Sequence, residues 1–135
     1  LVQRGGYIVH ESKKRAQAII ISSGSELNIC IDAAKKLKDE NIHVRVVSMP
    51  CIELFLSQPK SYRQKVLPDI DNVMAVEAGV GDCWDKFVGK LGAKVVMSSF
   101  GLSAPGGEVL KHFGFSQNNI IKQLKNLIKK NRKKK

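Results

Sequence analysis

The feature that most constrains the fold is the alternation of short, β-branched apolar runs with longer segments of helical periodicity. Residues 18–22 read Ala-Ile-Ile-Ile-Ser, which is typical of a strand that is buried on both faces, as in parallel sheets. Similar runs predict strands at residues 44–49, 73–77 and 93–98. The segments between them carry apolar residues three or four positions apart, which is the spacing of an amphipathic helix.

The first predicted helix follows residues 18–22. Ser23 and Glu26 have the spacing of a capping box, so the helix is expected to begin there. Its apolar stripe is expected to consist of Leu27, Ile31, Ala34 and Leu37. Further helical turns are predicted at residues 51–67 with a break near Pro59, at 84–91, at 109–113 and from Ser116 to Ile128.

Strands that alternate with helices predict an α/β fold: a three-layer αβα sandwich around a mostly parallel, mixed sheet of about five strands. Residues 7–9 are expected to add a short, antiparallel edge strand. The 135 residues suit one domain, which we expect to occupy residues 1–128. The sequence has neither an apolar signal segment nor a membrane-length apolar run. It begins abruptly with Leu1 rather than Met, so we interpret it as a piece of a longer protein.

The formal net charge of +11 is concentrated at the C-terminal end, where residues 122–135 contain eight basic residues and no acid. Residues 129–135 are therefore expected to form a basic, solvated tail. No aromatic residue interleaves these cations to stack on bases, so we do not expect a nucleic-acid partner.

Cysteine and histidine residues show no spacing typical of a metal site or of a catalytic pair. The isolated cysteines suggest a reduced, cytoplasmic protein whose thiols mostly fill the core; they are Cys30, Cys51 and Cys83. The histidines are expected at the surface or in loops; they are His10, His43 and His112.

A turn from strand to helix at residues 22–26 has two interpretations. Its serines cap the helix, or the free N–H groups of Ser23, Gly24 and Ser25 form a weak anion site. The stretch is neither a P-loop nor a dinucleotide-binding fingerprint. The capping interpretation is favoured.

A second glycine-rich turn follows the strand that ends at Glu77. Carboxyl ends of strands are where α/β folds place ligands, and a hard metal at Glu77, Asp82 and Asp85 is one interpretation. The favoured interpretation is that Glu77 accepts backbone hydrogen bonds from its own glycine-rich turn or faces a neighbouring domain, and that Trp84 belongs to the core. A further interpretation is an interface with a neighbouring domain or subunit, formed by Glu77, Gly79, Asp82 and Trp84. Ser103 lacks the G-x-S-x-G context of a nucleophile and is interpreted as a cap before Pro105.

A series of short motifs resembles the C-terminal domain of the transketolase family. The series runs in family order from about residue 4 to residue 128. It comprises Arg4-Gly5-Gly6-Tyr7, the turn at 22–26, residues 45–50 with Glu53 and Phe55, Tyr62-Arg63 with residues 66–68, residues 75–79 with Trp84, residues 100–105 and residues 113–115. The basic end after Ile128 falls outside the resemblance.

The resemblance implies a parent enzyme of the pentose phosphate pathway that transfers two-carbon ketol units between sugar phosphates. It implies that thiamine diphosphate and Mg²⁺ or Ca²⁺ bind in the preceding domains, between the first domain of one subunit and the middle domain of its partner. The family's cofactor and catalytic motifs are absent from this sequence, so no catalytic, cofactor-binding or metal-binding residue is carried over. We therefore expect a structural domain that packs on those preceding domains, supports a homodimer and is inactive alone.

Two alternatives remain open on the sequence. One is the C-terminal domain of a related thiamine enzyme, such as the pyruvate dehydrogenase beta subunit or deoxyxylulose-phosphate synthase. Two motifs count against it: Ser48-Met49-Pro50, and Phe100-Gly101 followed by Ser103-Ala104-Pro105. The other is a free-standing basic module that binds anions or nucleic acid.

Overall fold

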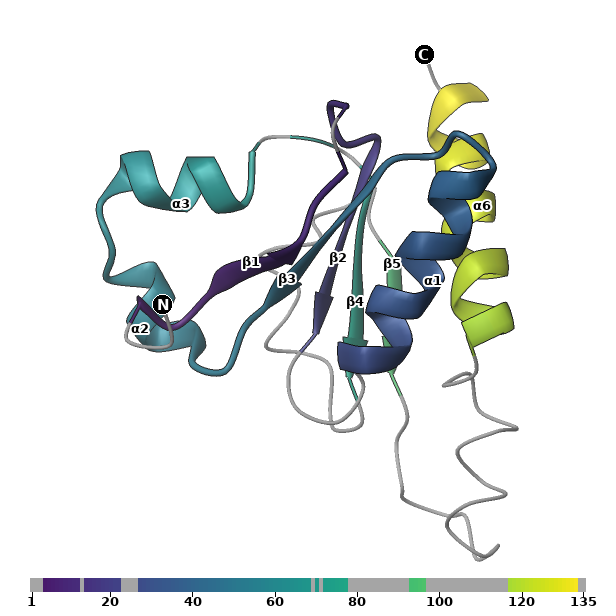
Figure 1. Ribbon diagram of the computed structural model, residues 1–135. Coiled ribbons are helices and arrows are strands. Elements are labelled where there is room, and N and C mark those ends of the chain that lie inside the picture. The colour runs from purple at the N-terminus through teal and green to yellow at the C-terminus, as the bar shows by residue number, and fades with distance from the viewer. Residues whose placement is uncertain are drawn as a thin grey trace, which may run out of the picture.

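A five-stranded mixed sheet with helices on both faces forms the domain (Figure 1). The computed structural model describes residues 4–12, 14–22, 27–68, 70, 72–77, 93–96 and 117–133. The strand order is β1-β3-β2-β4-β5, and the strands are β1 (Tyr7–His10), β2 (Ala18–Ser22), β3 (Val44–Ser48), β4 (Val73–Glu77) and β5 (Ala93–Val96). Strands β2 to β5 are parallel, and β1 is the antiparallel edge strand, paired with β3. The predicted α/β sandwich and its antiparallel edge are confirmed.

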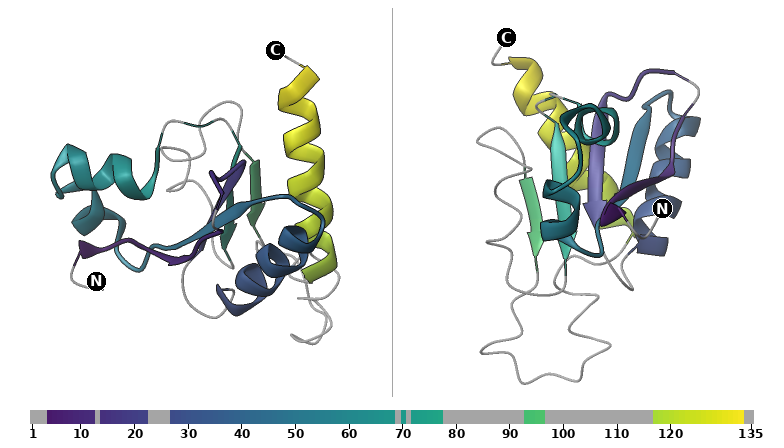
Figure 2. Two further views of the ribbon diagram at one scale, coloured as in Figure 1. Left: turned by 45° about the horizontal axis from the view of Figure 1, so that its top comes forward. Right: turned by 90° about the vertical axis from the view of Figure 1, so that its left-hand side faces the viewer.

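The helices form two layers (Figures 1 and 2). Helices α1 (Leu27–Asp39) and α6 (Gln117–Lys133) cover one face of the sheet, and α2 (Ile52–Leu56) and α3 (Lys60–Val66) cover the other. Pro59 is the N-cap residue of α3, which explains the predicted break because proline is tolerated at a helix start but not in its interior. The helices expected at residues 84–91 and 109–113 lie outside the described residues.

Strand β2 forms the centre of the core. Its residues are buried throughout and alternate between the layers: Ile20 packs with α1 and α6, whereas Ile19 and Ile21 pack with α2 and α3. This alternation follows from the two-residue period of a strand. The uninterrupted apolar run therefore reflects a strand that is covered on both sides.

The apolar stripe of α1 differs slightly from the expectation. The buried residues are Cys30, Ala33, Ala34 and Leu37, while Leu27 and Ile31 are only partly buried. The stripe is rotated because α6 packs against one flank of α1, so Cys30 and Ala33 become part of the contact layer. Asn41 ends the helix with a φ of 63°, and the N–H of Ile42 donates to the carbonyl of Leu37 at 2.9 Å.

Helix α6 continues past Ile128, where the sequence suggested the end of the domain. Its inner face buries Ile120, Leu124 and Leu127, and one turn later Asn131 is only 3% exposed. The Asn131 side-chain amide donates to Asn72 Oδ1 at 2.6 Å. Residues 129–133 are therefore helical and attached to the chain just before β4.

The segment Arg4-Gly5-Gly6 is held against α2 and α3. The Cys51 N–H donates to the Gly5 carbonyl at 3.0 Å, and the Tyr62 hydroxyl donates to the Gly6 carbonyl at 2.9 Å. The Arg4 guanidinium lies 4.5 Å from the centre of the Tyr62 ring, a cation–π contact. Within the described part of the chain, no helix combines the length and the apolar character that crossing a membrane requires.

Candidate functional site

The carboxyl edge of the parallel strands is the natural place to look for a site, because α/β folds place ligands there. Ser22 pairs with Ser48 of β3 and with Val76 of β4, so β2, β3 and β4 end side by side. The Met49 N–H donates to the Ser22 carbonyl at 2.8 Å. The Ser22 hydroxyl is fully buried and has no hydrogen-bond partner among the residues described.

The two turns that the sequence singled out leave from this edge. Ser23, Gly24 and Ser25 follow Ser22 directly but lie outside the described residues, so the anion site stays a prediction. The turn after Glu77 leaves from the neighbouring strand, because Ser22 pairs with Val76. Sequence reasoning placed each turn at the end of a strand without showing that the two strands are neighbours.

Glu77 is the last residue of β4 and pairs with Val96 of β5. The other members of the predicted interface, Gly79, Asp82 and Trp84, lie outside the described residues, as do Asp85 and Ser103. The predicted interface therefore stays a prediction. The structure adds that it would begin near the middle of the sheet, between β2 and β5.

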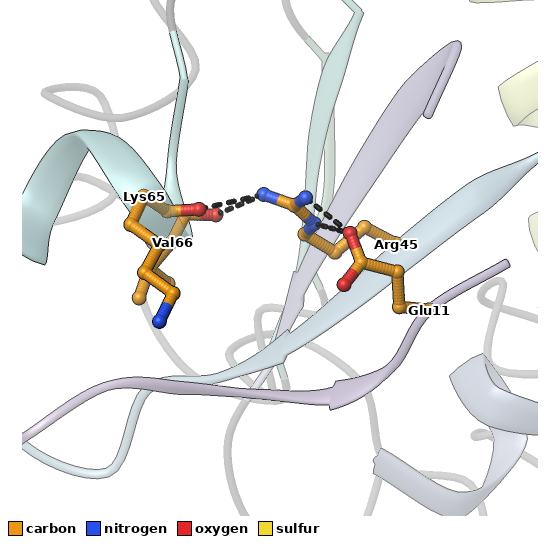
Figure 3. Close-up of polar contacts among 4 residues, drawn as sticks. All are labelled: Glu11, Arg45, Lys65 and Val66. Atoms are coloured by element: carbon orange, nitrogen blue, oxygen red, sulfur yellow. Dashed lines mark hydrogen bonds and ion pairs between the residues drawn. The ribbon is translucent and has the colours of Figure 1, made fainter. Parts of the chain in front are cut away.

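A polar cluster around Arg45 was not predicted from the sequence (Figure 3). Arg45 lies on β3 with 14% of its side chain exposed. Its guanidinium forms an ion pair with Glu11, in which Nε donates to Oε1 at 2.9 Å. One terminal nitrogen donates to the carbonyls of Lys65 at 2.9 Å and Val66 at 3.1 Å. The cluster uses the planar fork of arginine to join three segments, which is a structural role.

His43 belongs to a second polar cluster, at the amino ends of the strands. Its Nδ1 shares a hydrogen bond with the Ser12 hydroxyl, and its Nε2 lies 3.3 Å from Asn41 Oδ1. Its backbone N–H donates to Gln17 Oε1 at 3.0 Å. A serine and a histidine in contact suggest a nucleophile and its base. However, Ser12 is only 8% exposed, which favours a structural tie over substrate attack.

His10 is on β1, facing α1. Burial lowers the pKa of the His10 imidazole below its usual value of 6.5, and the positive charges of Lys35 and Lys38 lower that pKa further. The prediction of a surface or loop histidine is therefore wrong for His10, which is a half-buried strand residue. His112 lies outside the described residues.

The thiols and carboxylates in the described part of the chain form no metal-ligand cluster. Cys30 is buried in the core, as expected, and Cys51 is partly exposed with its Sγ 3.7 Å from Glu53 Oε2. No group of three His, Cys, Asp or Glu side chains is placed to hold a metal ion among these residues. The described residues therefore do not fit the divalent cation of a thiamine diphosphate site.

Comparisons with known proteins agree with the fold. The model of the transketolase-like TK C-terminal domain family matches residues 5–116. Transketolase from Buchnera aphidicola is 46% identical over 129 residues, which cover 95% of this chain and 19% of that protein. Transketolase 1 from Vibrio cholerae is 42% identical over 128 residues, which cover 94% of this chain and 19% of that protein.

Solved structures give the same result. Transketolase from Leishmania mexicana superposes with a TM-score of 0.85 and 44% identity, covering 96% of this chain and 18% of that one. Transketolase from Campylobacter jejuni superposes with a TM-score of 0.81 and 34% identity, covering 93% of this chain and 19% of that one. The chain thus spans about a fifth of the length of these relatives. From the family match and these identities together, the chain belongs to the transketolase family, to whose C-terminal domain it corresponds.

Proposed function

We propose that this chain is the C-terminal structural domain of a thiamine diphosphate-dependent transketolase. The parent enzyme would transfer a two-carbon ketol unit from a ketose phosphate to an aldose phosphate in the cytoplasm. Thiamine diphosphate, bound with Mg²⁺ or Ca²⁺ in the preceding domains, supplies the carbanion chemistry when present. The observation that carries the proposal is 44% identity over nearly the whole chain to a transketolase of which the chain covers only 18%.

The role of this domain would be positional. Its described polar side chains mostly tie elements of the domain to one another: Arg45 joins β3 to α3, and Asn131 joins α6 to the start of β4. Both ties lie toward the amino ends of the strands, while at the carboxyl edge the Met49 N–H donates to the Ser22 carbonyl at 2.8 Å. Together these contacts hold the strands in a fixed arrangement. A fixed carboxyl edge is what a domain needs in order to present its turns to a neighbour.

The contact with the neighbour would be made by the turn that contains Glu77, Gly79, Asp82 and Trp84. An aromatic side chain beside a glycine turn suits the desolvated centre of an interface. In the parent enzyme this surface would pack on a preceding domain or support the homodimer. Ser23, Gly24 and Ser25, on the neighbouring strand end, would provide a weak anion site at the rim of that contact.

The proposal that this domain is structural, and that catalysis and cofactor binding belong to the preceding domains, is tested with the parent enzyme and with this chain alone. We expect ketol transfer and micromolar or tighter thiamine diphosphate binding by the parent enzyme, measured by a coupled assay and by calorimetry. We expect neither with the 135-residue chain, whose folding circular dichroism verifies. Ketol transfer or tight cofactor binding by the folded chain alone would refute the proposal.

The interface is tested by Trp84→Ala in the parent enzyme, with Trp84→Phe as the matched control because it keeps an aromatic ring. Loss of a buried anchor of this size typically weakens an interface by about 2 kcal/mol or more. Sedimentation analysis and thermal unfolding report subunit and domain association respectively. Unchanged association and unchanged stability in Trp84→Ala would exclude an interface at this residue.

A further inference from the structure

Helix α6 carries a basic face. All charged residues of α6 are basic. Lys122, Lys129, Lys130 and Arg132 are exposed and form no ion pair with any described residue. Lys125 differs, because it pairs with Glu40 beyond the end of α1 at 2.5 Å. The sequence predicted a basic, solvated tail at residues 129–135, and residues 129–133 of that segment belong to α6.

The geometry of the helix places these four exposed cations together. At 100° per residue, Lys122, Lys129, Lys130 and Arg132 fall within about 160° of the helix circumference. The buried residues Ile120, Leu124, Leu127 and Asn131 lie on the opposite side. The basic face therefore points away from the sheet, and Figure 2 shows α6 on the outer side of the molecule. Lys122 and Lys129 are about 10 Å apart along the axis, at 1.5 Å per residue.

We propose that this basic face of α6 binds the phosphate backbone of double-stranded nucleic acid without reading its sequence. Rows of lysine and arginine that neutralise phosphates bind by releasing counterions, and need no base contact. The absence of aromatic residues from the basic run excludes stacking on single-stranded bases but not backbone contacts.

Two other anionic partners fit the surface less well. An interfacial membrane helix carries Trp, Phe or Leu beside its lysines, and a protein interface needs apolar anchors. The exposed large apolar side chains of the described residues are Leu54 and Leu56 on α2, on the other side of the sheet from α6 (Figure 1). Helix α1 next to α6 carries both signs of charge, with Asp32 and Asp39 among its lysines. Among these two helices, the purely basic surface therefore belongs to α6.

The test uses the intact protein and the triple variant Lys122→Gln/Lys129→Gln/Lys130→Gln. The matched control removes the same charge from other elements, as Lys14→Gln/Lys60→Gln/Lys65→Gln, whose exposed side chains belong to the connection between β1 and β2 and to α3. Fluorescence anisotropy measures binding to mixed-sequence DNA and RNA duplexes between about 50 and 200 mM salt. Vesicles containing phosphatidylserine and a polyglutamate peptide are the competing ligands.

The α6 variant is expected to bind both duplexes at least about tenfold more weakly, with a salt slope lower by about 0.9 for each lost phosphate contact. The control variant is expected to bind within about twofold of the unmodified protein. Absence of duplex binding at low salt, equal losses in the two variants, or preference for the vesicles or the peptide would each overturn the proposal.

Discussion

At the scale of single residues, the Arg4-Gly5-Gly6 segment shows how local sequence is tied to packing. Gly5 has a φ of 80°, in the left-handed region that side chains disfavour. A methyl group at Gly5 would meet the backbone of Cys51 and Phe55, whereas at Gly6 it would meet the side chains of Met49 and Phe55. The two glycines are therefore required for different reasons, one by the backbone and one by side-chain packing.

Gly5→Ala is expected to destabilise the domain by more than about 1–2 kcal/mol, the cost of the left-handed conformation alone, because backbone atoms also have to move. Gly6→Ala is expected to cost less, since Met49 is flexible and can shift. Urea unfolding of the two variants measures the difference. A larger loss in Gly6→Ala than in Gly5→Ala would contradict the assignment of the backbone constraint to Gly5.

His10 predicts a dependence of stability on pH. Burial and the nearby lysines lower its pKa in the folded state below the 6.5 of the unfolded chain. Between these two pKa values the unfolded state binds more protons, so stability rises with pH. The folding stability associated with the neutral His10 imidazole is fully present above pH 6.5 and is lost as the pH falls toward the lowered pKa of the folded state.

His10→Gln, which cannot gain a proton, is therefore expected to lose less stability than the unmodified protein between about pH 7.5 and pH 5. Lys38→Gln is expected to weaken the effect, because one of the charges that lower the pKa is removed. Urea midpoints at constant ionic strength give the comparison. If the stability of the unmodified protein and of His10→Gln fell in parallel with pH, His10 would not be the cause of the pH dependence.

At the scale of elements, the sequence predicted the described helices and strands closely, because each has a strong local signal. Residues 18–22 and 73–77 form β2 and β4 with the expected bounds, and Pro59 separates α2 from α3. The two departures are the rotated stripe of α1 and the extension of α6 past Ile128. Both depend on a partner far away in the sequence, and hydrophobic periodicity carries no information about such partners.

The extension of α6 leads to a prediction about Asn131. Asn131→Ala removes the hydrogen bond to Asn72 in a buried environment, which is expected to cost about 1–3 kcal/mol. Asn126→Ala is the control on the same helix, since Asn126 is exposed. Thermal and urea unfolding compare the two variants. Equal stability of Asn131→Ala and Asn126→Ala would indicate that residues beyond 128 contribute little to the domain.

At the scale of the whole molecule, Arg45 joins parts of the chain that are distant in sequence. Its guanidinium connects the segment after β1, strand β3 and the end of α3, across sequence separations of 20 to 34 residues. Because Lys65 and Val66 present carbonyls rather than acidic side chains, no charge pattern in the sequence could reveal this contact.

Arg45→Met is expected to destabilise the protein by about 1.5–3 kcal/mol, since charged hydrogen bonds are lost and Glu11 loses its partner. Arg45→Lys is expected to recover part of the loss, because it keeps the charge but not the planar fork. Arg15→Met, at an exposed position, is the control. If chemical unfolding gave Arg45→Met and Arg15→Met the same free energy of unfolding, Arg45 would have no structural role.

In the candidate site, the positions of single residues could be predicted from the sequence, but their proximity in the fold could not. The positions of Ser22 and Glu77 at the ends of strands could be predicted, since an apolar run that stops at a polar residue and a glycine turn is a local signal. Their proximity could not, because it depends on strand order: β2 pairs with β4, although α1, β3, α2 and α3 separate them in the chain.

Local patterning was enough to fix the α/β class, the described strands and most of the helical surface, because backbone geometry imposes its own period on the apolar residues of each segment. The sheet order, the pairing of Ser22 with Val76, the polar tie made by Arg45 and the burial of Asn131 were decided in three dimensions. These features follow from which segments share the limited space on each face of the sheet, and that competition involves the whole chain at once.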